Sequence, residues 1–351
     1  MLKLNPAGRL ASLEAEMKAR KLDSFLVTNE TNVSYLSGFL GGDSIILATR
    51  EKDFFLTDSR YIEEARSGVR GFDIELVKLS TYKTLQSIIS KNRLKKIGFE
   101  SMSLPYEVSG RLKDLAPGAT FVPIRDLVEG IRSVKDRQEV ALIRDSIKLA
   151  KAVLERTISC VVPGVTEASL AKKIELEFIT HGAEAGFKPI VASGANASKP
   201  HAQPGENVIK TNSFAMIDIG CTLRRYNSDI TRMVVLGKVS NRFKRIYDVV
   251  REAQDKGIAA IKPGERLSKI DKAARNHINA KGFGKHFGHS LGHGVGMEVH
   301  ESPNVSALSE GIAREGMVFT VEPAIYITGF GGVRIEDMVL VTKNGCEVLT
   351  K

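Results

Sequence analysis

Short apolar runs alternate with longer amphipathic stretches over the first 125 residues of the chain. Four of these runs, at 23–29, 43–49, 52–58 and 95–100, are bounded by turn residues and have the length of buried strands. Helical patterns lie between several of them. This alternation predicts an α/β layer in the N-terminal part of the chain.

The segment 116–140 breaks this alternation. It contains two prolines and two glycines, then charged residues, then an amphipathic pattern that predicts a helix from about Ser133. We therefore expect two domains, an N-terminal α/β domain of residues 1–128 and a C-terminal domain of residues 129–351.

The C-terminal part contains a weak internal repeat. Segments 163–182 and 263–282 align without gaps, and each reads as a Pro-Gly turn, a helix and a glycine stop. Matched turn residues at both ends favour two similar α/β halves with a cleft between them.

Composition narrows the class of protein. The longest apolar runs are far too short for a membrane span, and the N-terminal stretch lacks the apolar core of a signal peptide, so we expect a cytoplasmic protein without a membrane partner. The three cysteines form no CxxC pair, which agrees with a reducing compartment. The net charge of +10 is spread along the chain without a basic arm, so we expect no nucleic-acid partner.

Four acidic residues stand where apolar strands are expected. Asp218 and Asp229 lie in strand-like runs on either side of a polar tract that is long enough for a hairpin turn. Glu322 and Glu336 lie in two later runs. A carboxylate buried in such a run needs a cation or several hydrogen-bond donors, and backbone amides are one alternative source of donors.

A histidine-rich segment, GHSLGHGVGMEVHE, lies between the two acidic pairs at residues 288–301. Its histidines are His289, His293 and His300. Several carboxylate oxygens with imidazole suit a divalent transition metal, and bridging carboxylates suit two metals.

The residues around these positions resemble a known family. IDIG at Asp218, SDITR at Asp229, the histidine-rich segment, VEPAIY at Glu322 and RIEDMVLVT at Glu336 resemble, in order and in most spacings, the motifs of the dinuclear "pita-bread" metallopeptidases. They are most similar to the Xaa-Pro branch, which contains aminopeptidase P and prolidase. The resemblance implies an α/β (α+β) fold class, with a creatinase-like N-terminal domain before a pita-bread domain that has an internal pseudo-two-fold repeat.

The resemblance also implies a role for each matching residue. The expected cofactor is a pair of divalent ions, Mn²⁺ first and Co²⁺, Zn²⁺ or Fe²⁺ as alternatives, with Asp229 and Glu336 bridging both ions. The implied metal ligands are Asp218, Asp229, His293, Glu322 and Glu336. The implied catalytic residues are His201, His300, Glu322 and Arg334, and the implied substrate-binding residues are Phe187, His289, Tyr326 and Arg334. Glu301, next to His300, receives no ligand role.

By this resemblance we expect a metal-dependent exopeptidase that uses a metal-bridging hydroxide to cleave the Xaa-Pro bond of peptides or dipeptides. Its partners would be substrates with proline in second position and a second copy of the chain in a homodimer. The alternatives are a methionine-aminopeptidase-like or broader aminopeptidase, a creatinase-like hydrolase and a non-catalytic peptide-binding module. Two residues depart from the family pattern: Ala324 replaces a common glycine, and Lys199 replaces a common leucine.

Overall fold

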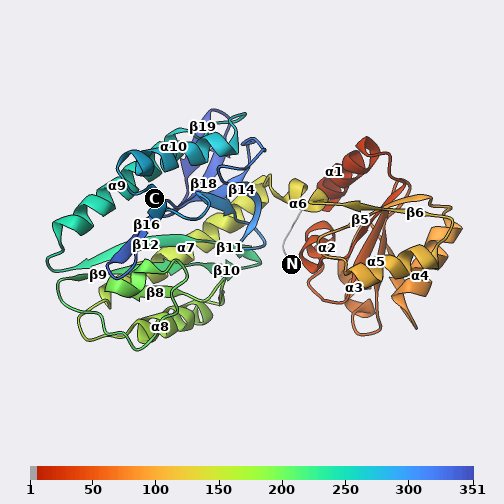
Figure 1. Cartoon of the computed structure of the whole chain (residues 1–351). Helices are drawn as coiled ribbons and strands as arrows, with labels where there is room; N and C mark the ends of the chain where they lie inside the picture. Colours follow the sequence, from red (N-terminus) through yellow and green to blue (C-terminus); the bar gives the residue numbers. More distant parts are fainter. Residues whose placement is uncertain (1–5) are drawn as a thin grey trace. The chain divides into compact units, whose positions relative to one another are not determined.

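The computed structural model describes residues 6–351, which divide after residue 132 into two compact units (Figure 1). None of the helices within this range is both long and apolar enough to cross a membrane. Each unit has its own sheets and its own apolar packing.

The N-terminal unit is a six-stranded mixed sheet with strand order β4-β3-β2-β1-β5-β6. Its strands are β1 (Ser24–Val27), β2 (Ile45–Thr49), β3 (Phe54–Thr57), β4 (Asp73–Leu76), β5 (Lys96–Glu100) and β6 (Thr120–Ile124). Its helices are α1 (Pro6–Ala19), α2 (Glu30–Ser37), α3 (Ile62–Gly68), α4 (Thr81–Lys91), α5 (Tyr106–Leu115) and α6 (Leu127–Arg132). The predicted α/β layer is confirmed.

The hydrophobic pattern of the sequence did not predict two strands of this sheet. β4 and β6 are the edge strands, so neither is the continuous buried run that the hydrophobic pattern detects. β6 also contains Pro123, which is tolerated at a sheet edge because no partner strand needs its missing N–H. One of the two prolines of segment 116–140, Pro123, therefore belongs to a strand.

The C-terminal unit begins with the long helix α7 (Arg137–Ser159), which starts later than the expected Ser133. Asp136 sets the start, because its carboxylate accepts the backbone N–H groups of Gln138 and Glu139, and the Glu139 side chain completes a capping box.

The internal repeat is visible in two helix pairs, α7 with α8 (Glu167–Thr180) and α9 (Asn241–Ala259) with α10 (Leu267–Ala280). The second helix of each pair lies between two glycines in the left-handed region. These are Gly164 and Gly182 in the first half and Gly264 and Gly282 in the second, with φ between 71° and 98°. The residue before α8 forms a bridge with Val208, and the residue before α10 forms one with Ile312. The predicted internal repeat of the C-terminal unit is thus confirmed.

Four small sheets complete the unit. The first is β12-β9-β8 and the second is β14-β13-β15-β18-β19, with β16 paired to β17 and a hairpin of β10 and β11 paired to β7. The strands are β7 (Glu184–Ala185), β8 (Ile190–Ser193), β9 (Ser213–Ile219), β10 (Cys221–Leu223), β11 (Tyr226–Asn227), β12 (Ile230–Leu236), β13 (Gly292–Gly294), β14 (Glu301–Val305), β15 (Val318–Val321), β16 (Ala324–Ile327), β17 (Gly331–Arg334), β18 (Asp337–Thr342) and β19 (Gly345–Val348). The 3₁₀ turn η1 (Gly194–Ser198) lies between β8 and β9, and the 3₁₀ turn η2 (Gly284–His286) lies between α10 and β13.

Each helix pair packs on the sheet of its own half. Val153, Ile174 and Phe178 of α7 and α8 bury against Ile217 and Ile219 of β9. The α9 and α10 side chains pack in the same way against β15 and β18. Apolar burial of this kind stabilises each half by about 25 cal/mol per Å². It also holds the strands that carry the acidic residues in fixed positions.

Candidate metal centre

Two antiparallel strands carry the aspartates. Asp218 lies in β9 directly opposite Thr231 in β12, and Asp229 comes just before β12 begins. The tract between them forms the β10–β11 hairpin, which pairs with β7 instead of extending the β9–β12 sheet. Both carboxylates therefore reach the same end of this strand pair.

The glutamates lie beside strands rather than within them. Glu322 follows the last residue of β15. Glu336 occupies a two-residue break between β17 and β18, which belong to different sheets, so the single strand expected over this run is wrong. In the break the Glu336 N–H donates to the Thr231 carbonyl at 3.3 Å. The change of sheet turns Glu336 toward the aspartates on β9 and β12.

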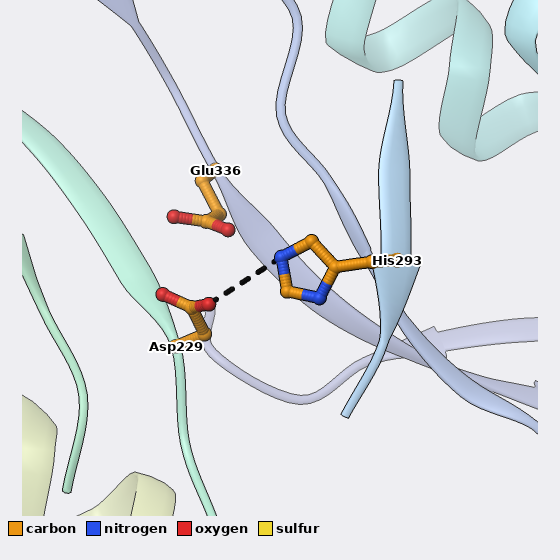
Figure 2. A group of neighbouring side chains, drawn as sticks. All are labelled: Asp229, His293 and Glu336. Carbon is orange, nitrogen blue, oxygen red and sulfur yellow. Dashed lines mark ion pairs between the residues drawn. The ribbon is translucent and has the colours of Figure 1, made fainter. Parts of the chain in front are cut away.

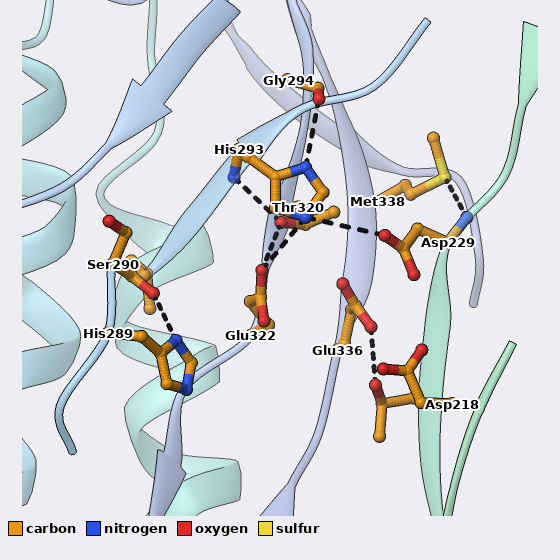
Figure 3. A network of polar contacts seen from close by, with 12 residues as sticks. Asp218, Asp229, His289, Ser290, His293, Gly294, Thr320, Glu322, Glu336 and Met338 are labelled. Carbon is orange, nitrogen blue, oxygen red and sulfur yellow. Dashed lines mark hydrogen bonds and ion pairs between the residues drawn. The ribbon is translucent and has the colours of Figure 1, made fainter. Parts of the chain in front are cut away.

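His293 enters the same space from β13. Its preceding residue must be glycine, because a Cβ at Gly292 would lie 1.9 Å from the Thr320 carbonyl oxygen. The ring places Nδ1 3.1 Å from the Gly294 carbonyl, a contact that fits a protonated Nδ1 and leaves Nε2 for the acids. Nε2 lies 3.3 Å from Glu322 and 3.6 Å from Asp229 (Figure 3).

Ligand atoms of Asp229, His293 and Glu336 lie within 4.8 Å of one another (Figure 2). Burial raises the pKa of Asp229 and Glu336 well above the usual values, and the neighbouring carboxylates raise it further. Burial also raises the pKa of Asp218, against the opposing charge of Arg334. For His293, burial disfavours the imidazolium, but the hydrogen bond and charge of Glu322 outweigh it and raise the pKa.

These residues fit a divalent metal ion. Asp218, Asp229 and Glu336 are 7%, 4% and 2% exposed, and Asp218 Oδ1 has no hydrogen-bond partner within residues 6–351. Buried carboxylates that lie this close together are stabilised in their ionised form by a bound cation. Carboxylate oxygens with one imidazole nitrogen are donors that Mn²⁺, Co²⁺, Zn²⁺ and Fe²⁺ accept.

One side of the cluster is built around Arg334. Its guanidinium donates to Asp218 and Thr231, and through Nη1 to the Tyr326 hydroxyl at 2.6 Å and the Pro200 carbonyl at 3.0 Å. Burial raises the pKa of Tyr326 to about 12, so this hydroxyl stays protonated at neutral pH. The His289 ring lies 5.8 Å from the Tyr326 ring, centroid to centroid.

The remaining predicted residues lie around the cluster. The His300 ring is 4.1 Å from the His293 ring, and burial lowers its pKa, with a further contribution from His293. His201 is exposed, and its charge would lower the pKa of His300. The Phe187 ring lies against Gly220, where a Cβ would come within 2.7 Å of it. The structure thus brings the five proposed ligands together with His289, His300, Tyr326 and Arg334.

Sequence analysis missed the residues that orient this set. Thr231 donates to Glu336 at 2.7 Å while accepting from Arg334, so one hydroxyl aligns both groups. The sequence signal that could have identified Thr231 is its position in the SDITR motif, two residues after Asp229. Asp271 and Arg275 of α10 hold the segment that carries His289, through the carbonyls of Phe287 and His289 and the N–H of Leu291. No sequence signal marks that pair, because its targets are backbone atoms.

Comparison with known proteins places this geometry in a family. Residues 141–343 match metallopeptidase family M24, and residues 9–134 match the creatinase/prolidase N-terminal domain. The chain is 39% identical to the uncharacterized peptidase YqhT of Bacillus subtilis, over 94% of each chain. An Xaa-Pro dipeptidase from Bacillus anthracis superposes with a TM-score of 0.95 at 36% identity, covering 99% of this chain and 98% of that one. An X-Pro aminopeptidase from Thermotoga maritima gives 0.87 at 33%, covering 96% and 97%.

Replacing Asp229 by asparagine is expected to remove one or both metal equivalents, because the acidic cluster would lose one negative charge and one ligand oxygen. Mass-spectrometric metal analysis after dialysis against Mn²⁺ measures this. The control is Asp248→Asn, whose carboxylate is exposed in an ion pair with Arg251. Two full equivalents in Asp229→Asn would contradict the ligand assignment.

Proposed function

Since the chain belongs to metallopeptidase family M24, we propose that it is a metal-dependent exopeptidase that cleaves the bond between an N-terminal residue and proline. The observation that carries this proposal is the full-length similarity to an Xaa-Pro dipeptidase and an X-Pro aminopeptidase, N-terminal domain included. The substrate is a peptide or a dipeptide with proline in second position.

The metal pair would be held by the five residues that enter one space from both halves of the unit. They are Asp218, Asp229, His293, Glu322 and Glu336. When bound, such a pair supplies Lewis acidity, which lowers the pKa of water toward neutrality and polarises a carbonyl group.

Residues of the chain would stabilise the developing oxyanion and transfer a proton to the leaving nitrogen. The lowered pKa of His300 leaves a neutral imidazole, whose N–H donates to the oxyanion that develops on the scissile carbonyl. Glu322 carries a proton to the proline nitrogen as it leaves. A free substrate amine bound beside Asp218 would account for cleavage of a single N-terminal residue.

His289, Tyr326 and Arg334 would form the proline site. The two rings provide flat apolar surface for a pyrrolidine, and the protonated Tyr326 hydroxyl is fixed by Arg334. Proline lacks a backbone N–H, so its site needs no acceptor for that group. Phe187, beside Gly220, is suited to contact the residue before proline.

A second candidate is a methionine-aminopeptidase-like or broader aminopeptidase activity, since related enzymes share this metal site. The N-terminal domain of residues 9–134 favours the Xaa-Pro branch, because methionine aminopeptidases normally lack a domain of this size. The complete set of five ligand residues disfavours both a non-catalytic binding module and creatinase-like chemistry without metal.

The purified protein with Mn²⁺ or Co²⁺ is expected to hydrolyse Ala-Pro, Ala-Pro-Ala or both, and to leave Met-Ala-Ser intact. Chromatographic detection of released alanine or methionine measures the three reactions. Cleavage of Ala-Pro alone identifies a dipeptidase, and cleavage of Ala-Pro-Ala identifies an aminopeptidase. Hydrolysis of Met-Ala-Ser alone, or of none of the three, would refute the proposal.

Replacing His300 by alanine is expected to lower kcat by about 10²-fold or more, the usual scale for a lost oxyanion donor. Both metal equivalents should remain, because His300 is not among the proposed ligands. His181→Ala is the matched control, since that histidine caps α8 at an exposed position. Unchanged turnover in His300→Ala would remove this residue from the mechanism.

A further inference from the structure

A buried ion pair lies beside the proposed active site but outside the ligand set. Lys135 Nζ is 2.8 Å from Glu301 Oε1, and the two side chains are 0% and 3% exposed. Removing two charges from water costs several kcal/mol per ion, so such a pair contributes little net stability. What it does supply is a fixed distance between two segments of the chain.

On the glutamate side, the pair closes the turn formed by residues 296–301. The Glu301 carboxylate accepts the Glu298 N–H at 3.3 Å. It also lies so close to Gly296 that a Cβ there would be 2.3 Å from Oε1. At the other end of the turn, the Gly296 carbonyl accepts both the backbone N–H and the side-chain amide of Asn227, at 2.8 and 3.0 Å. The turn is therefore held at both ends.

The backbone around Lys135 contacts the residues directly before β15, the strand that precedes Glu322. The Lys135 N–H donates to the Gly316 carbonyl at 2.9 Å, and Val134 forms a bridge with Met317 directly before β15. Nζ donates further to the Ser133 carbonyl at 3.3 Å. The ammonium thus has a fixed position relative to β15.

His300 is the residue that this turn presents to the cluster. Within residues 6–351 its ring has no hydrogen bond, although it lies 4.1 Å from the His293 ring. With no side-chain contact of that kind to orient it, His300 takes its position from the backbone of the turn. The constraint on that backbone comes from Asn227 at one end and from Lys135 through Glu301 at the other.

We propose that Lys135 is a positioning residue, whose buried ion pair with Glu301 holds the 296–301 turn so that His300 faces His293 and the acidic cluster. The proposal rests on the proposed function, because His300 has its role only in that reaction. It assigns a purpose to Glu301, which sequence analysis left without one, and to Lys135, which it did not single out.

The test is a double-mutant cycle of Lys135→Met and His300→Ala, with Lys148→Met, an exposed lysine of α7, as the control. In Mn²⁺-loaded enzyme, Lys135→Met should lower kcat on the order of 10-fold to 100-fold, the scale of a displaced catalytic group. KM should stay within about twofold. Added to His300→Ala, Lys135→Met should cause no further loss. Full kcat in Lys135→Met, or a multiplied loss in the double variant, would overturn the proposal.

A measurement without substrate separates this proposal from the proposed function. Hydrogen exchange of the peptide that contains residues 296–301 should be roughly tenfold faster in Lys135→Met, and exchange in β9 and β12 should be unchanged. Faster exchange in a protein that cleaves no Xaa-Pro substrate would refute the function while supporting the role of the pair. Unchanged exchange would refute that role. If Lys135→Met does not fold, Glu301→Gln, which keeps the shape of the carboxylate, receives the same measurements and the same criteria.

Discussion

The burial of several carboxylates in one small space is the constraint on which the catalytic unit depends. Asp218, Asp229 and Glu336 are nearly inaccessible to water, and burial raises the pKa of each. The guanidinium of Arg334 contacts only the first of the three directly. A fold that brings acids together in this way needs further positive charge, and the proposed pair of divalent ions would supply it. The same arrangement that is costly without metal would then make the site reactive with it.

The repeated architecture lets both halves contribute to one site without sharing a strand. The second helix of each pair holds a loop that leads to a proposed site residue. In the first half, the buried Glu167 of α8 accepts from Ser193 and Asn196 and so fixes the loop that leads to His201. In the second half, Asp271 and Arg275 of α10 do the same for the segment with His289. Both loops are thus anchored to helices that belong to the two apolar cores.

The fold and the candidate ligands were predictable where local sequence carries the cause. An aspartate such as Asp218 in an apolar run signals buried charge, and matched Pro-Gly turns signal the repeat. No local sequence pattern predicts a contact between distant segments. The ion pair of Lys135 with Glu301 therefore could not be predicted from the sequence. Glu336 lies beside the other acids, as expected, but outside the strand predicted for it, because a change of sheet within one apolar run does not alter its composition. The edge strand β6 was missed because Pro123 is a breaker in sequence terms and harmless at a sheet edge.

In the proposed metal centre, the acids and His293 surround two divalent ions. Anomalous diffraction from crystals grown with Mn²⁺, with data collected on both sides of the manganese absorption edge, tests this proposal most directly. Two anomalous peaks are expected, both among Asp218, Asp229, His293, Glu322 and Glu336. A single peak, or peaks away from these carboxylates, would contradict it.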